Sequence, residues 1–230
     1  KTLAVAGLSV VGRDHYGVFP LRGKCKNVRD ASVAQLSSNQ EFSDLKKILG
    51  LQQGKEYTDV SELRYGRLMI MTDADNDGSH IKGLIINMIH AFWPSLLDLG
   101  FVVSMVTPII KATKGSQSKS FYTDSAFRAW YGDGKAGWRI KYYKGLGTST
   151  SAEAREYFKM IETLTVKFDV DVMTDESVVL AFDKKKADAR KTWLLESTAK
   201  EANQLEVSYG NIKQLGISEF IHEDLVNFSL

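Results

Sequence analysis

A short apolar run that leads directly into three alternating aspartates constrains this chain more than any other feature. Residues 68–71 have no polar face and are followed by turn-forming residues, so they predict a buried β-strand. Asp73, Asp75 and Asp77 come next, at every second position. Alternate side chains of an extended segment point the same way, so the three carboxylates are expected to converge. Carboxylates about 5 Å apart repel by roughly 3 kcal/mol per pair at an effective dielectric of about 20, which calls for a cation.

A helix is expected to follow the acidic turn. Apolar residues recur at helical spacing from Ile81 to Phe92, which predicts an amphipathic helix that begins near Ser79 or His80 and ends or kinks at Pro94. In open α/β sheets, ligands bind at the carboxyl ends of the strands, where this turn lies.

Three interpretations of the acidic turn compete. The spacing of the aspartates and Gly78 matches the first half of an EF-hand calcium loop, but the twelfth position holds Leu84 in place of a bidentate Glu. In the second interpretation the segment is a solvated turn that binds no ion, since Asp, Asn and Gly are common turn residues. We favour the third, a magnesium site for phosphoryl transfer, because Mg²⁺ uses one or two carboxylates and leaves room for phosphate oxygens.

Composition and charge set only wide limits. The chain has 230 residues and is 43% hydrophobic, which suffices for a sizeable core. Its formal net charge of +2 neither favours nor excludes nucleic acid, so any basic footprint has to be local. The single cysteine excludes an internal disulfide and fits a reducing compartment. The apolar start is too short to span a bilayer, and its first residue, Lys1, favours a piece of a longer polypeptide.

Strands and helices are expected to alternate along the chain, which predicts a parallel α/β sheet. The periodicity and the capping residues predict helices over residues 2–11, 40–49, 124–131, 151–162, 176–189 and 217–226. Asp124 is the expected cap of the third, and Thr150 with Glu153 has capping-box spacing before the fourth. Further strands are expected over residues 16–21, 101–106, 109–111, 138–143 and 166–172, with a polar loop at 113–119.

Three separated motifs resemble the Toprim region of type IIA DNA topoisomerases. They are Phe19-Pro-Leu-Arg-Gly-Lys24 with Asn27-Val-Arg29, the acidic segment 71–84, and Tyr143-Lys-Gly-Leu-Gly-Thr-Ser-Thr150. The motifs occur in order over nearly the whole chain and together are highly specific. Other segments look like the eukaryotic or large-DNA-virus branch, whereas Ala74 is more typical of the bacterial branch.

The resemblance implies an α/β Toprim fold, a Rossmann-like parallel sheet flanked by helices. It implies three regions: a Toprim domain without its first strand at residues 1–162, a connector with a helical segment at 163–212, and the truncated start of a winged-helix domain at 213–230. It also implies the function of the family, an ATP-dependent type II topoisomerase that breaks one duplex transiently and passes a second duplex through it.

The resemblance further implies a site that holds two Mg²⁺ ions beside the DNA phosphate. Asp73 would contribute to both metal positions and Asp75 to the second, with Asp77 in support. Residues expected to contact DNA are Arg22, Lys24, Asn27, His80 and Lys144. The expected partners are double-stranded DNA and a second copy of the same enzyme, with no membrane. ATP would bind to a separate domain, and the expected location is the nucleus, or else a mitochondrion or the compartment of a virus-infected cell.

The chain also departs from the family pattern. The Glu-Gly-Asp-Ser-Ala motif, whose Glu is a metal ligand in the family, does not occur, and the nucleophilic tyrosine of the winged-helix domain falls outside this chain. No catalytic residue is therefore assigned, and the fragment alone is expected to be inactive. Two other functions remain open: a non-catalytic module that binds divalent cations for assembly, and a Toprim primase or nuclease.

Overall fold

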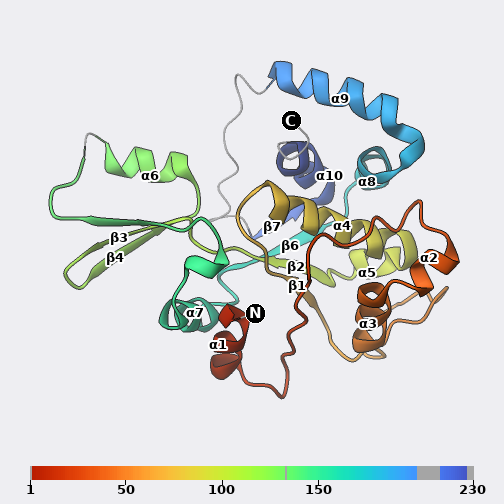
Figure 1. Ribbon diagram of the computed structural model, residues 1–230, viewed down its shortest axis with the longest axis horizontal. Coiled ribbons are helices and arrows are strands. Elements are labelled where there is room, and N and C mark those ends of the chain that lie inside the picture. Colours follow the sequence, from red (N-terminus) through yellow and green to blue (C-terminus); the bar gives the residue numbers. More distant parts are fainter. Residues whose placement is uncertain (1, 133, 201–212, 227–230) are drawn as a thin grey trace.

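The computed structural model describes residues 2–132, 134–200 and 213–226 (Figure 1). Its main sheet has the strand order β1-β2-β6-β7, formed by Leu68–Ile70, Val102–Met105, Thr165–Asp169 and Gln214–Gly216. β1 pairs with β2 and β6 with β7 in parallel, whereas β2 and β6 are antiparallel. The expected α/β fold, a parallel-containing sheet flanked by helices, is confirmed. The sheet is nevertheless mixed, where the alternation of elements predicted a wholly parallel one.

A second sheet builds an arm that extends away from the main sheet (Figure 1). We use the name arm for residues 109–132 and 134–143. Its strands have the order β4-β3-β5 and are antiparallel, and they comprise Ile110–Lys114 (β3), Gln117–Phe121 (β4) and Arg139–Tyr142 (β5). Helix α6 (Asp124–Tyr131) covers one face, and a separate small core of buried side chains joins it to the strands: Ile110, Ala112, Phe121 and Phe127.

The arm accounts for the antiparallel pairing in the main sheet. The chain leaves β2 at Met105 and enters β6 at Thr165, and these two residues are register partners. A parallel strand would require the chain to cross back to the opposite end of the sheet. The arm and helix α7 (Ser151–Lys159) instead return the chain at the end where it left.

Helices pack around the main sheet and bury its hydrophobic side chains. Helices α4 (Asn76–Phe92) and α5 (Pro94–Asp98) connect β1 to β2, and α1 (Thr2–Val11) packs against α7. The remaining helices are α2 (Val33–Ser37), α3 (Gln40–Leu49), α8 (Thr174–Phe182), α9 (Ala187–Lys200) and α10 (Ile217–Phe220), the last continuing into a π-helical turn at Ile221–Leu225. No helix within the described ranges has the length and apolar character needed to cross a membrane.

Elements that depend on local sequence are predicted well. The helices expected at residues 2–11 and 40–49 are confirmed as α1 and α3, and Gly50 ends α3 with a φ of 79°. The capping box of Thr150 and Glu153 is also confirmed, with α7 ending at Lys159. These features need only neighbouring residues, which explains the agreement.

Two expected features of extended segments are wrong. Residues 16–21 form no strand, because Phe19 and Leu21 pack against the main core without a pairing partner. Residues 113–119 are not a loop. They comprise the end of β3, a tight turn at Gly115, whose φ is 57°, and the start of β4, which pair as a hairpin. Their polar side chains are explained by the exposure of β4 along most of its length.

Two expected features of helices are also wrong. The segment 176–189 is interrupted at Asp183, where extended backbone separates α8 from a short 3-10 turn and α9. The cap of α6 is Thr123 and not Asp124, since the Thr123 hydroxyl accepts the hydrogen bond from the Ala126 N–H.

The packing of α1 on α7 predicts sensitivity to side-chain size at Gly7. A Cβ at this position would lie 2.3 Å from the ring of the buried Phe158. Overpacking of this kind costs about 1–3 kcal/mol, which exceeds the gain of about 0.5–1 kcal/mol from replacing glycine in a helix. Gly7→Ala is therefore expected to lower the free energy of unfolding by about 1 kcal/mol, measured by urea denaturation followed by circular dichroism. Ser9→Ala, exposed on the same helix, is the control and should change it by less than about 0.5 kcal/mol. A Gly7→Ala variant as stable as the parent would contradict the prediction.

Candidate metal and nucleic-acid site

The three aspartates leave β1 at its carboxyl end, but the chain does not stay extended through all of them. Helix α4 begins at Asn76 and not near Ser79 or His80 as predicted. Asp75 is its N-cap, and the Asp75 carboxylate accepts a hydrogen bond of 2.8 Å from the Gly78 N–H. Asp77 consequently lies in the first helical turn. The expectation that all three carboxylates project from one face of an extended segment is therefore wrong for Asp77.

Asp73 joins the acidic segment to the Lys-Gly-Leu-Gly motif. Its Oδ1 accepts a hydrogen bond of 2.6 Å from the Leu146 N–H. Gly145 lies against the same carboxylate, and a Cβ at this position would be 2.7 Å from Asp73 Oδ2. Gly145 has ordinary extended backbone, so it is close approach and not an unusual dihedral angle that requires glycine here. Two motifs far apart in the sequence thus meet at one carboxylate.

Lys24 brings the basic loop to the same segment. Its Nζ lies 2.7 Å from Asp77 Oδ1, and the two side chains are 42% and 69% exposed. An ion pair as exposed as this one contributes little to stability, so an incoming phosphate can compete for the lysine. The three motifs identified from the sequence therefore converge in the structure.

The other expected DNA contacts differ in their surroundings. Arg22 and Lys144 are exposed, and the Arg22 backbone N–H donates to the Glu41 carboxylate at 3.1 Å. His80 is half-buried in α4. Burial, together with the charge of Lys24, lowers the pKa of His80 below its ordinary value of 6.5. The imidazole is accordingly neutral at pH 7 and offers hydrogen bonds instead of positive charge.

Asn27 turns its side-chain amide into the protein. Its Nδ2 donates to the Phe182 carbonyl at 2.7 Å, and its Oδ1 accepts from the Arg29 N–H and from Asn87 Nδ2. Asn87 is fully buried in α4, so these bonds attach the basic loop to α4 and α8. We therefore assign Asn27 to positioning the loop. The motif alone could not separate this role from direct DNA contact.

The donor chemistry at the acidic turn fits magnesium better than calcium. Within the described ranges, no three His, Cys, Asp or Glu side chains lie close enough together to hold a metal ion. Calcium takes six to eight oxygen ligands, whereas magnesium needs only one or two carboxylates, with water and phosphate oxygens completing its shell. Asp75 and Asp77 are exposed carboxylates, and Asp73 is half-buried beside Gly145. Such a set fits an ion that also uses phosphate oxygens.

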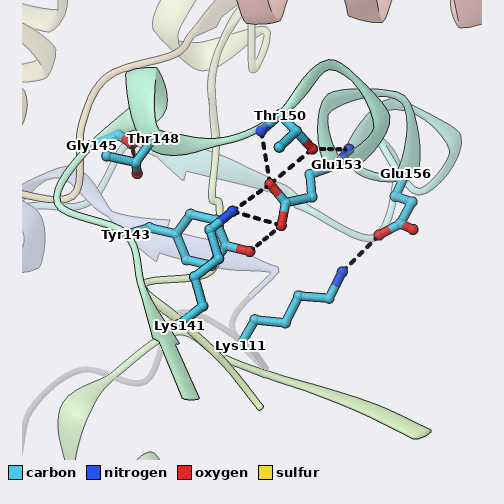
Figure 2. A network of polar contacts seen from close by, with 8 residues as sticks. All are labelled: Lys111, Lys141, Tyr143, Gly145, Thr148, Thr150, Glu153 and Glu156. Carbon is cyan, nitrogen blue, oxygen red and sulfur yellow. Dashed lines mark hydrogen bonds and ion pairs between the residues drawn. The ribbon is translucent and has the colours of Figure 1, made fainter. Parts of the chain in front are cut away.

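A polar network missed by the sequence analysis supports the Lys-Gly-Leu-Gly loop (Figure 2). The Glu153 carboxylate accepts hydrogen bonds from the Thr150 N–H at 2.7 Å, from Lys141 Nζ at 2.9 Å and from the Tyr143 hydroxyl. Tyr143 immediately precedes Lys144, so Glu153 ties the start of the loop to α7. The capping-box spacing identified Glu153 only as a cap, because its contacts with β5 depend on tertiary structure.

The ionisation of Glu153 follows from this network. Burial opposes the charged form, but the hydrogen bonds from Thr150, Tyr143 and Lys141 outweigh it and lower the pKa of Glu153 from 4.5 to about 2. Burial and the bond to Glu153 raise the pKa of the Tyr143 hydroxyl. Glu153 is therefore a carboxylate, and Tyr143 a neutral donor, throughout the neutral range.

Comparisons with known proteins agree with this architecture. The chain matches the model of the Toprim domain over residues 2–106 and that of the C-terminal associated domain of TOPRIM over residues 105–230. It therefore belongs to the family of Toprim proteins that carry this associated domain. The resemblance to type IIA topoisomerases is also confirmed, because the relatives described next are DNA topoisomerases 2.

The probable DNA topoisomerase 2 of Dictyostelium discoideum and the DNA topoisomerase 2 of Pisum sativum are each 51% identical to the chain over its full length. The chain spans only 15% and 16% of these two relatives. A crystal structure of the Plasmodium falciparum topoisomerase II DNA-binding, cleavage and re-ligation domain superposes with a TM-score of 0.91 at 46% identity. That match covers 99% of this chain and 31% of the Plasmodium chain.

The Glu153 network predicts a stability that depends on pH. In Glu153→Gln, one carboxylate oxygen becomes an NH2 group, so Thr150 and Tyr143, which donate to different oxygens of Glu153, cannot both keep an acceptor. The negative charge that faces Lys141 is lost as well, so the free energy of unfolding should fall by about 2 kcal/mol at pH 7. The folded-state pKa is lowered, so the stabilisation is present above about pH 4.5 and is lost as the pH falls towards about 2. Thermal unfolding of the parent chain and of Glu153→Gln between pH 7 and pH 2 tests whether their stabilities become equal at low pH.

Glu156→Gln is the matched control, on the same helix. Glu156 pairs with Lys111 but is 59% exposed, so its replacement should cost less than about 1 kcal/mol. Equal losses in the two variants, or a Glu153→Gln deficit that persists at pH 2, would contradict the assignment.

Proposed function

We propose that the chain is the metal-binding part of the DNA cleavage and religation core of an ATP-dependent type II DNA topoisomerase. The observation that carries this proposal is the convergence of three motifs, through the Leu146 bond to Asp73 and the pair of Lys24 with Asp77. The names of the relatives support the activity, since those compared are DNA topoisomerases 2. They favour this function over an assembly module and over a primase or nuclease.

The acidic segment would hold two magnesium ions with Asp73, Asp75 and Asp77. Bound magnesium neutralises charge on the non-bridging and leaving oxygens of the phosphate. The chain's own residues fix where this happens. Asp73 is held by the Leu146 N–H and the surface of Gly145, while Asp75 and Asp77 remain exposed at the start of α4.

Cations beside glycines would hold the duplex through its phosphates. Arg22 and Lys24 flank Gly23, and Lys144 precedes Gly145, so backbone and side chain can both approach a phosphate closely. Lys24 would exchange its partner Asp77 for a phosphate when DNA binds. His80, neutral at pH 7, would act through hydrogen bonds. Phosphate contacts of this kind give affinity with little base recognition.

The remaining parts of the activity belong to other segments of such an enzyme. ATP would bind to a separate domain, because no Gly-Lys-Ser/Thr phosphate loop occurs in this chain. The nucleophilic tyrosine would come from the winged-helix domain that we propose begins near residue 213. The enzyme would act on double-stranded DNA as a homodimer in the nucleus, each subunit cutting one strand. The proposed connector, 163–212, lies outside the described residues from 201 onward.

The metal assignment predicts that Asp75→Asn separates DNA cleavage from DNA binding. Asn is as good an N-cap as Asp, so α4 should form while the charge is lost. The variant is best made in a chimera in which this chain replaces the matching segment of the Dictyostelium relative. Magnesium-dependent cleavage of plasmid DNA should fall at least about 100-fold, because metal stabilisation is worth several kcal/mol, while salt-sensitive binding is retained.

Asp98→Asn provides the control for this experiment, since Asp98 is exposed at the end of α5. Cleavage by this variant should equal that of the parent chimera. Undiminished cleavage by Asp75→Asn would defeat the assignment of Asp75 as a metal ligand.

A further inference from the structure

Positive charge is concentrated on the arm and its junction with the Lys-Gly-Leu-Gly loop. Residues 107–144 contain eight lysines and arginines and two aspartates, a net charge of +6, whereas the whole chain carries +2. The remaining residues therefore carry a net charge of −4. A basic footprint that is absent from the overall composition is present locally, as nucleic-acid binding requires.

Some of these cations are neutralised by carboxylates and some are not. Lys111 pairs with Glu156, Lys141 with Glu153 and Arg128 with Asp124. Three exposed lysines, Lys114, Lys119 and Lys135, form no ion pair with any acidic residue that the structure describes. We call these three the arm lysines.

Two of the arm lysines lie over one tryptophan, and the third, Lys114, lies near Lys135. Lys119 Nζ and Lys135 Nζ lie 5.4 Å and 5.3 Å from the centre of the Trp130 ring. Lys114 faces the same side of the sheet as Lys119, since Ala112 is the register partner of Lys119 and side chains alternate along β3. Lys114 Nζ also donates to the Ala136 carbonyl at 3.0 Å, directly beside Lys135.

The aromatic ring of Trp130 holds Lys119 and Lys135 without neutralising them. Trp130 is itself fixed against Phe121 and Trp138, with ring centres 5.0 Å apart in both pairs. Cation–π contacts attract an ammonium group but leave its charge intact. Like charges held close together repel one another, and a polyanion with several separate charges would relieve this repulsion.

We propose that the arm lysines are a second contact for duplex DNA, on phosphates outside the candidate metal site. This inference rests on the proposed function. Strand β5 connects the two places, because it starts at Arg139 and leads through Tyr143 into Lys144. At about 3.3 Å per residue, its length places the outer part of the arm about 13–17 Å from Lys144. That distance corresponds to about four or five base-pair steps of 3.4 Å along the same duplex. Continuity with the DNA expected at Lys144 favours duplex DNA over an acidic protein.

The test compares two triple variants of the 230-residue chain that remove the same charge. One carries Lys114→Gln, Lys119→Gln and Lys135→Gln. The control carries Lys47→Gln, Lys159→Gln and Lys167→Gln, which replace exposed lysines on the separate elements α3, α7 and β6. Fluorescence anisotropy measures binding to a duplex of about 20 base pairs, which is long enough to span both contacts, over a range of salt concentrations. EDTA is present throughout, so that the result does not depend on the metal site.

The arm variant is expected to bind the duplex at least about tenfold more weakly and to lower the slope of log affinity against log salt by up to about 3. Binding by the control variant should change little. A variant with arginine at the three arm positions keeps the charge and should bind like the parent. Thermal unfolding establishes that every variant remains folded.

Two results would overturn the proposal. Equal losses in the arm and control variants would show that charge acts without regard to place. Unchanged DNA binding by the arm variant, with loss of binding to polyglutamate, would assign the arm to an acidic protein partner. Neither of these results bears on cleavage by Asp75→Asn, so failure of this inference is distinguishable from failure of the proposed function.

Discussion

The hydrogen bond from the Leu146 N–H to the Asp73 carboxylate is the contact on which the candidate site depends. Asp73 follows a strand of the main sheet, and Leu146 follows the last strand of the arm, so no local interaction holds them together. A hydrogen bond to a charged acceptor is worth about 1.5–3 kcal/mol, enough to set the position of a loop. The bare surface of Gly145 permits it, since a Cβ there would meet the carboxylate. One carboxylate thereby fixes the distance between the acidic turn and Lys144.

The interactions around this contact divide into fixed and exchangeable ones. Glu153 is only 14% exposed and accepts bonds from α7, β5 and Tyr143, so it makes the base of the Lys-Gly-Leu-Gly loop rigid. Asn27 does the same for the basic loop through α4 and α8. The pair of Lys24 and Asp77, in contrast, is exposed and weak. A site built in this way keeps its framework while the groups that would meet phosphate remain free to change partners.

The sequence predicted what neighbouring residues decide and failed where distant ones decide. The strand β1, the helix α3 with Gly50 and the capping box of Thr150 all follow from local patterns, and all are present. Of the expected burial of β1, only that of Ile70 is complete. The antiparallel pairing of β6 depends on where the arm returns the chain, and no periodicity records that. The candidate site was identified residue by residue through its motifs, yet the bonds that assemble it join residues 24 to 77 and 73 to 146. The inward orientation of Asn27 likewise depends on Phe182 and Asn87.

The early start of α4 changes the electrostatic argument drawn from three alternating carboxylates. Their mutual repulsion was expected to demand a cation, but each carboxylate already has its own compensation: the Leu146 N–H at Asp73, the Gly78 N–H at Asp75, and Lys24 at Asp77. The N-terminal end of α4 adds a favourable dipole for Asp75 and Asp77. A carboxylate can accept about four hydrogen bonds, so each retains lone pairs for a metal after these contacts are made. The acidic turn can therefore persist without an ion and still bind one, which suits a centre where metal and phosphate arrive together.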